Sequence, residues 1–227
     1  MKFWNWTKNQ KGDRVLKILG IIDYSEGTTP EEFRGELQAS EGNIFVEINS
    51  PGGSVFAAAE IYEMLKGYSG GKVTARIVAF AASAATIIAM AADTVEISTL
   101  AVMCIHNPFL DYVQGEKKDL LKAVIYLDEI KENIITAYEQ KTTLSRQEIS
   151  KLMDDETYMN SKKAVELHFA DKIIDGEEKE LTAEMYSRQQ EVKTLLKKFN
   201  ITTSLMEHAN KKFNTEILHR KILLGGM

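Results

Sequence analysis

The segment that most constrains the fold is the turn at residues 49–55, with the sequence Asn-Ser-Pro-Gly-Gly-Ser-Val. A β-rich alternating stretch at residues 44–48 precedes it. After it, Ser54 is a typical helix N-cap, and the residues that follow place an apolar face at helical spacing. That face comprises Ala58, Ile61, Tyr62, Leu65 and Tyr68. The turn therefore predicts a strand that passes directly into an amphipathic helix.

The same order of strand and helix repeats along the chain. Capping boxes at residues 29–32 and 145–148 mark two helix starts, and residues 116–142 have the periodicity of a long amphipathic helix. Strands are expected at residues 15–22, 44–48, 72–78, 94–97 and 102–106, and further helices at 30–39, from 54, at 83–92 and from 145. This order is typical of an α/β domain.

Residues 77–92 form an uncharged run that could be mistaken for a membrane span. The run is shorter than the roughly 20 residues that a bilayer requires, and it is rich in alanine with Ser83 and Thr86 inside it. We therefore expect a buried strand that leads into a buried helix.

The composition limits the classes of function. A chain of 227 residues that is 44% apolar can bury one substantial core, so we expect one main domain. The net charge of −5 argues against nucleic acid as the main partner, because binding to phosphates needs a concentrated basic face. The single cysteine, Cys104, fits a reducing compartment, and the N-terminus lacks the apolar core of a signal peptide. Cytoplasmic residence without a membrane partner is therefore the expectation.

Three regions are expected. Residues 1–14 form an N-terminal segment, residues 15–178 the main domain, and residues 179–227 a helical or flexible tail. The tail is net positive, whereas the rest of the chain is net negative. It contains no motif that indicates a chemistry.

Ser83 and His106 are the candidates for nucleophilic chemistry. A serine hydroxyl needs a neighbouring base and donors for the developing oxyanion. Ser83 lies at the expected strand-to-helix junction, where the amide of Ala84 points outward, and the amide of Gly53 is the candidate for the second donor. His106 lies at a strand end before Asn-Pro, where a functional side chain is well placed. The alternatives are that Ser83 is a small helix-packing residue and that His106 is a hydrogen-bonded core histidine.

Other reactive residues are weaker candidates. Cys104 shares a strand face with His106, but a cysteine in an apolar strand is usually only buried. His168 follows a helical run, and His208 and His219 lie in the tail. No His, Cys and carboxylate cluster has metal-ligand spacing, so neither a metal nor another cofactor is expected.

At these residues the chain resembles the ClpP-like serine peptidase family. The motifs that carry the resemblance are the Asn-Ser-Pro-Gly-Gly turn, Ala-Ala-Ser at residues 81–83 and His-Asn-Pro at residues 106–108, and it spans residues 15–174. Together with Phe-Trp-Asn-Trp at residues 3–6 and the run at 56–62, they are most similar to the bacteriophage head maturation (prohead) proteases. The resemblance implies a crotonase-like spiral of β-β-α units, with residues 116–142 as a long protruding helix between stacked homo-oligomeric rings.

The resemblance also implies a catalytic triad. Ser83 would be the nucleophile and His106 the general base, and the register of the family pattern places Glu156 as the acidic member, with Asp155 as the alternative. A solvated helix end is the other interpretation of residues 154–156. The chain departs from the family pattern at Ala79 and His168, where glycine is common.

The implied function is a serine endopeptidase that acts through an acyl-enzyme and processes phage capsid or scaffold proteins during head maturation. It would work without ATP or with an AAA+ unfoldase as partner. Two alternatives come from other classes. One is a catalytically inactive ring-forming scaffold, and the other is a crotonase-like acyl-CoA enzyme, because that fold also uses two backbone amides.

Overall fold

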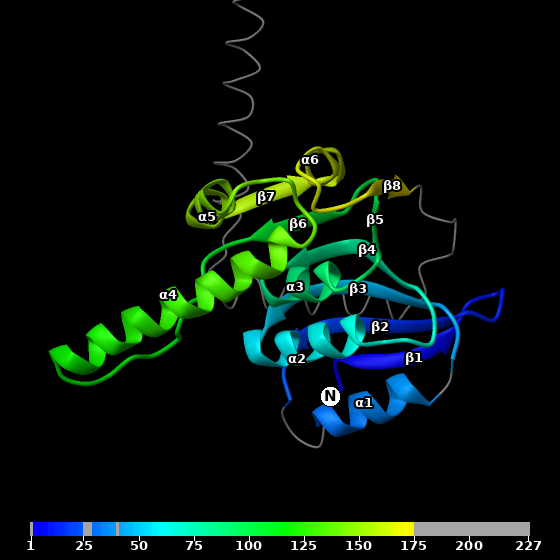
Figure 1. Ribbon diagram of the computed structural model, residues 1–227, viewed down its shortest axis with the longest axis horizontal. Helices are drawn as coiled ribbons and strands as arrows, with labels where there is room; N and C mark the ends of the chain where they lie inside the picture. Colours follow the sequence, from blue (N-terminus) through cyan, green and yellow to red (C-terminus); the bar gives the residue numbers. More distant parts are fainter. Residues whose placement is uncertain (1, 25–28, 40, 175–227) are drawn as a thin grey trace, which may run out of the picture. The chain divides into compact units, whose positions relative to one another are not determined.

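The computed structural model describes residues 2–24, 29–39 and 41–174 (Figure 1). The tail expected at residues 179–227, with His208 and His219, lies outside the described residues. Within the described ranges the chain is a mixed α/β structure, which agrees with the fold class that the sequence predicts.

One twisted sheet of eight strands organises the described part of the chain, and six of them run in the order β1-β2-β3-β4-β5-β8. Strand β6 pairs with β4 and with β7, off this path. All pairings are parallel except β1 with β2 and β6 with β7. The strands are β1 (Trp4–Lys8), β2 (Arg14–Ile22), β3 (Ile44–Gly53), β4 (Val73–Ala82), β5 (Thr94–Ser98), β6 (Val102–Ile105), β7 (Thr157–Asn160) and β8 (Lys172–Ile174).

The helices begin at the caps that the sequence predicts. The hydroxyls of Thr29, Ser54 and Ser145 each accept a hydrogen bond from a backbone amide in the first turn of their helix. The helices are α1 (Pro30–Gln38), α2 (Val55–Lys66), α3 (Ala84–Met90), α4 (Lys117–Glu139), α5 (Arg146–Asp154) and α6 (Ser161–Glu166). The five strands and five helices expected from periodicity are therefore all present, with shifted ends.

The N-terminal segment is part of the sheet. Strand β1 pairs with β2, and Trp4 is buried against Phe3, Tyr24 and Phe33 at ring-centroid distances of 4.8, 6.1 and 5.4 Å. Within the N-terminal segment expected at residues 1–14, residues 2–14 thus supply an edge strand and part of an aromatic cluster to the same structure.

Strand β4 is the element that positions the candidate site. Its first half pairs with β5, from Thr74 to Ile77, and its second half pairs with β6, from Phe80 to Ala82. The sheet therefore divides along β4, and the ends of β4 and β6 lie side by side. The uncharged run at residues 77–92 is this strand end followed by α3, as predicted.

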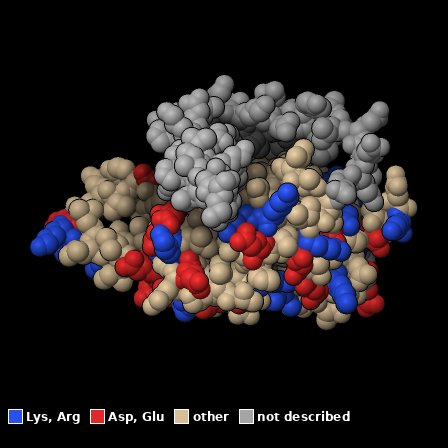
Figure 2. All heavy atoms as spheres, turned by 90° about the horizontal axis from the view of Figure 1, so that it is seen from above, with Lys and Arg blue, Asp and Glu red and all other residues tan. Residues whose placement is uncertain are grey.

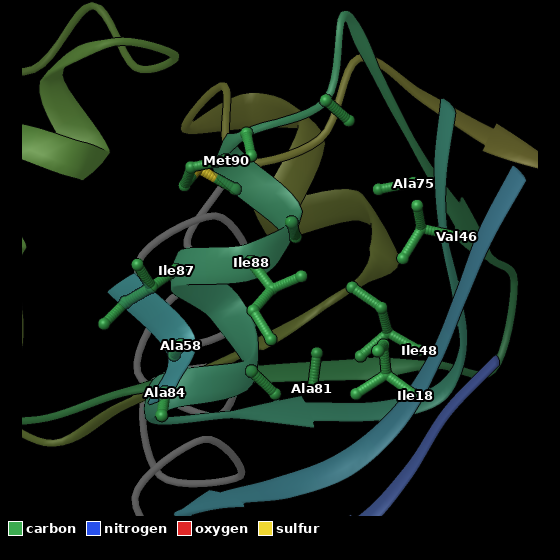
Figure 3. Close-up of a cluster of buried hydrophobic side chains, with 14 of the residues drawn as sticks. Ile18, Val46, Ile48, Ala58, Ala75, Ala81, Ala84, Ile87, Ile88 and Met90 are labelled. Atoms are coloured by element: carbon green, nitrogen blue, oxygen red, sulfur yellow. The ribbon is translucent and has the colours of Figure 1, made fainter. Parts of the chain in front are cut away.

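Helix α3 packs on the sheet through small side chains. All of its residues are buried, and Ile88 points toward the strands that carry Ala81 and Ile48, whereas Ile87 lies on the opposite side of the helix (Figure 3). Burial of isoleucine side chains contributes about 1.5–3 kcal/mol each. The N-terminus of α3 is in this way held directly above the end of β4.

Helix α4 has two different halves. Near its C-terminus, Ile130, Ile134, Ile135 and Tyr138 are buried, whereas near its N-terminus the apolar side chains are exposed. The exposed ones are Leu120, Leu121, Val124, Ile125 and Tyr126. Only the second half of the helix packs on the described core.

Charged residues of both signs are interspersed on the face shown in Figure 2. No helix among residues 2–24, 29–39 and 41–174 is long and apolar enough to cross a membrane.

Candidate active site

Ser83 forms the turn between β4 and α3 and has an unusual backbone conformation. Its φ of 54° and ψ of −129° lie outside the regions that residues with a side chain normally adopt. Such a conformation costs about 1–3 kcal/mol and is typical of functional sites, as at the strand-to-helix turn of serine hydrolases. Ser83 is partly exposed, and its hydroxyl does not cap α3. The side chain is therefore free for chemistry.

Three hydrogen bonds hold the backbone of Ser83 in this conformation. Its amide donates to the carbonyl of Cys104 at 3.0 Å, and its carbonyl accepts from the Thr86 amide and the Thr86 hydroxyl at 2.9 and 2.6 Å. Because the Thr86 hydroxyl donates to Ser83, it must accept from the hydroxyl of Tyr138, which lies 2.7 Å away. A buried chain of hydrogen bonds thus connects α4 to the nucleophile turn, which is the turn between β4 and α3 that contains the candidate nucleophile Ser83.

The glycine turn lies against Ser83. A Cβ added to Gly52 would stand 2.7 Å from the Cβ of Ser83 and 2.9 Å from the Ala84 amide nitrogen, and one added to Gly53 would stand 2.3 Å from the carbonyl oxygen of Ile22. Only glycine fits at either position. The amide of Gly52 donates to the hydroxyl of Ser50, so Gly53 stays the candidate for the second donor, beside the first amide of α3 at Ala84.

His106 directly follows β6, beside the nucleophile turn. Its Nδ1 lies 2.7 Å from the carbonyl oxygen of Asn107. A carbonyl oxygen only accepts, so Nδ1 carries the hydrogen, and in the neutral ring Nε2 then has the lone pair that a general base needs. The alternative of a core histidine fits less well, because His106 is partly exposed.

The strand pairing brings Ser83 and His106 close together without a hydrogen bond between them. Ala82 pairs with Cys104, so each candidate lies one or two residues beyond a paired position. Among the described residues, no bond joins the Ser83 hydroxyl to the imidazole. Catalysis would need this hydrogen bond to form when substrate binds. Catalytic hydrogen bonds are often long in substrate-free sites and shorten in the complex.

Glu156 lies across from His106. The last pair of β6 and β7 is Ile105 with Thr157, and the next residue on each strand is His106 and Glu156. The Glu156 carboxylate, however, accepts a hydrogen bond from the Tyr158 hydroxyl at 3.1 Å, and no ion pair with His106 is present among the described residues. Asp155, the alternative, is exposed and pairs with Lys151. The acidic member of the triad therefore stays a prediction.

Cys104 is buried in β6 and is not activated. Burial raises the pKa of its thiol to about 12, and the charge of Glu156 adds to that effect. The thiol is protonated at neutral pH, which does not favour a cysteine nucleophile.

Sequence reasoning missed the residues that support the site from other elements. Thr86 and Tyr138 hold the nucleophile turn, and Asn107 and Asp154 bond to each other beside the imidazole. Buried polar side chains in an otherwise apolar stretch, such as Thr86, are the one signal that could have indicated a structural hydrogen bond.

His168, at the end of α6, has a φ of 59° where the family pattern often has glycine. Within residues 2–24, 29–39 and 41–174, no three His, Cys, Asp or Glu side chains gather as in a metal site.

A strained serine at the start of a buried helix, with a histidine at the end of the neighbouring strand, defines the serine hydrolase class of site. Residues 34–177 match the sequence model of the Clp protease family. The chain belongs to this family of serine-type peptidases.

Several relatives have similar sequences. The chain is 29% identical to the ATP-dependent Clp protease proteolytic subunit of Porphyromonas gingivalis, over 74% of this chain and 76% of the relative. It is 31% identical to the proteolytic subunit 1 of Chlamydia muridarum, over 61% of this chain and 73% of the relative. The proteolytic subunit of Ligilactobacillus salivarius is 25% identical, over 74% and 86%.

Proposed function

We propose that the protein is a serine endopeptidase that forms an acyl-enzyme on Ser83. His106 Nε2 removes the hydroxyl proton as Oγ attacks the scissile carbonyl, and the resulting imidazolium returns the proton to the leaving amine. Water then attacks the ester with the same base, which releases the acid and restores the serine. Family membership and the strained, partly exposed Ser83 support this proposal.

The oxyanion would be bound by the amides of Ala84 and Gly53. The Ala84 amide is the first of α3 and has no acceptor within its helix, and the helix dipole adds positive potential there. Removal of one such donor typically costs about 100-fold to 1,000-fold in rate.

Glu156 is proposed as the carboxylate that stabilises the imidazolium. Its position, opposite His106 and one residue beyond the β6–β7 pairing, supports this role. The negative charge of its carboxylate would stabilise the imidazolium without a direct hydrogen bond. Glu156→Gln should lower the rate of peptide cleavage, and Asp155→Asn should not.

The proposed substrates are phage capsid or scaffold proteins during head maturation. This part of the proposal depends on the similarity of residues 3–6 and 56–62 to prohead proteases, and residues 4–8 form the edge strand β1. Expression together with a capsid protein encoded beside this chain, followed by mass spectrometry of the new termini, would test it. Uncut capsid protein in the presence of active enzyme would remove this part of the proposal.

We also propose that the protein assembles into homo-oligomeric rings that stack through α4. The exposed apolar side chains between Leu120 and Tyr126 support this, because such a patch on a helix usually marks an interface. The related subunits are named as ATP-dependent, so an AAA+ unfoldase is the corresponding partner. Sedimentation of the protein with and without the unfoldase would test both interactions.

The observation that carries the catalytic proposal is the backbone of Ser83. The test is cleavage of a fluorogenic peptide library by wild type, Ser83→Ala, His106→Ala and, as a matched control, His168→Ala. Loss of about 100-fold or more is expected for the first two variants only. Equal activity in all four proteins would contradict the proposal. No cleavage by the wild type would favour the inactive scaffold, and thioester turnover independent of Ser83 would favour the acyl-CoA enzyme.

A further inference from the structure

The residue after His106 is fixed to two helices. The amide nitrogen Nδ2 of Asn107 donates to Oδ1 of Asp154, at the end of α5, over 2.8 Å. The ammonium of Lys131, from the middle of α4, binds the same oxygen at 2.6 Å. Lys131 and Asn107 both hold the pKa of the Asp154 carboxyl below its usual range. The three side chains form a continuous polar contact, which we call the 107–154–131 clamp.

The clamp acts on the residue whose carbonyl fixes the imidazole. The Asn107 carbonyl oxygen accepts from His106 Nδ1, so the position of residue 107 decides which ring nitrogen is protonated and where the ring points. In a serine–histidine site that task usually belongs to the acidic residue. Here the Glu156 carboxylate is bonded to Tyr158.

We propose that Asn107 orients the catalytic imidazole through its backbone carbonyl and that Asp154 and Lys131 are positioning residues for this reaction. The inference rests on the proposed function. It divides the work of the acidic residue in two: the Asn107 carbonyl selects the tautomer, and Glu156 supplies the negative charge that stabilises the imidazolium.

The surroundings support a positional role for the clamp. The Lys131 side chain is 18% exposed although it is charged, so its stem is packed along the surface and its ammonium is directed at Asp154. The Oδ1 atom of Asn107 is buried, and it has no hydrogen-bond partner within residues 2–24, 29–39 and 41–174. A buried amide oxygen without a partner destabilises the folded state. The side-chain orientation that leaves Oδ1 without a partner is the one that lets Nδ2 donate to Asp154. A purely solvated helix end would not require it.

The neighbouring pair provides a matched control. Lys151 and Asp155 also form an ion pair at 2.6 Å, next to Asp154 in the sequence, but both are exposed and, among the described residues, neither side chain forms a hydrogen bond with Asn107. Any effect that comes only from surface charge or from the end of α5 would occur equally in Asp155→Ala.

The experiment measures the rate at which a fluorophosphonate probe labels Ser83 in the full-length protein. Asn107→Ala and Asp154→Ala should each slow labelling about tenfold to 100-fold, since small displacements of a reacting group have effects of this size. Lys131→Met should slow it less, Lys131→Arg should restore it, and Asp155→Ala should stay within about twofold of wild type. The double variant Asn107→Ala/Asp154→Ala should be no slower than the slower single variant, because both remove one contact.

A second readout separates orientation from folding. Nitrogen-15 NMR of labelled histidine, with the His106 signal assigned by its loss in His106→Ala, reports the protonated ring nitrogen. The Nδ1–H tautomer should predominate in wild type and decrease in Asn107→Ala and Asp154→Ala, while the thermal midpoint falls by less than about 4 °C.

The outcomes distinguish the inference from the function on which it rests. Labelling of the wild type at Ser83 with equal rates in the clamp variants would overturn the inference and leave the function intact. An unlabelled wild type would overturn the proposed function, and the tautomer measurement would then decide the clamp: an unchanged tautomer in the variants overturns it, and a changed one supports it.

Discussion

The nucleophile turn, which is Ser83 between β4 and α3, and the base loop, which is His106 and Asn107 after β6, are held in opposite ways. Ser83 is fixed by backbone bonds and by Thr86 and Tyr138, which are 0% and 1% exposed. His106 is fixed by a loop whose support, Asp154, has a side chain that is 53% exposed. One half of the site belongs to the core, and the other half belongs to the surface.

The difference indicates how each half tolerates change. Substitutions around Ser83 disturb packing and buried hydrogen bonds, so they should reduce stability and activity together. Substitutions around His106 disturb exposed polar contacts, which contribute little to the free energy of folding, so they should reduce activity alone. The predictions below run from the largest expected effect to the smallest.

Gly52→Ala should have the largest effect. The added Cβ would stand 2.6 Å from the Ala82 carbonyl oxygen and 2.7 Å from the Ser83 Cβ, so the turn must move. We expect activity to be abolished and the thermal midpoint to fall by several degrees. Gly20→Ala is the control, because Gly20 also has a positive φ, of 73°, but has open space around it. Equal loss in both variants would mean that backbone conformation alone, and not contact with Ser83, explains the result.

Thr86→Val should reduce stability and activity together. It removes one of the two donors to the Ser83 carbonyl and leaves the buried Tyr138 hydroxyl without its partner, at a cost of about 1–3 kcal/mol. Tyr138→Phe should cost less, because Thr86 can still donate to Ser83. Urea unfolding and peptide cleavage measure the two effects. Lower activity of Thr86→Val without lower stability would contradict the assignment of this region to the core.

Salt should affect the base loop more than the nucleophile turn. At 1 M salt the screening length is about 3 Å, so the partly exposed pair of Lys131 and Asp154 weakens while buried neutral bonds do not. We expect labelling of Ser83 to slow several-fold at an unchanged thermal midpoint, and labelling of Asp154→Ala to be insensitive to salt. An equal response of both proteins would contradict the ionic support of the loop.

The pH dependence of the contacts that Asp154 makes with Lys131 and Asn107 follows from the pKa of Asp154. Lys131 and Asn107 lower that pKa below its ordinary value of 3.8 in the folded protein. The stabilisation is therefore fully present above the unfolded pKa and is lost only as pH falls through the lower folded pKa. The ratio of wild-type to Asp154→Asn labelling rates should stay constant between about pH 5 and pH 8. A ratio that falls steadily across this range would show that another group controls the loop.

Cys104→Ala should have the smallest effect on activity, within about twofold, because a protonated buried thiol takes no part in the reaction. The pKa of about 12 in the folded protein is above that of an unfolded cysteine, so the Cys104 thiol stays protonated to a higher pH in the folded state. Folding stability should therefore fall in the wild type as pH rises above about 9, and fall less in the variant. Urea midpoints at pH 8 and pH 10 measure this difference, and parallel curves would contradict the raised pKa.

The sequence predicts the local structure around Ser83 well, as a strand that leads into a helix. Local signals are sufficient there, because the uncharged run before Ser83 and the Pro-Gly-Gly turn each dictate a strand followed by a helix. The boundaries were less exact: β3 and β4 continue to Gly53 and Ala82, beyond the expected ends, because their parallel partners extend the pairing.

The base half could not be predicted in the same way. Strand β7 is four residues long and is defined by its pairing with β6, and β1 lies in a segment expected to be separate. The bond between Asn107 and Asp154 joins residues 47 positions apart, and no periodicity reports such a contact. Family resemblance directs attention to Glu156, whereas the contacts beside the imidazole come from Asn107.

The most direct test of the account is the site at which a fluorophosphonate attaches to the full-length protein. Peptide mapping by mass spectrometry should find one adduct, on Ser83, formed rapidly in wild type and His168→Ala and at least about 100 times more slowly in His106→Ala. An adduct on another residue, or equally fast labelling of Ser83 without His106, would contradict the claim that these two side chains act together.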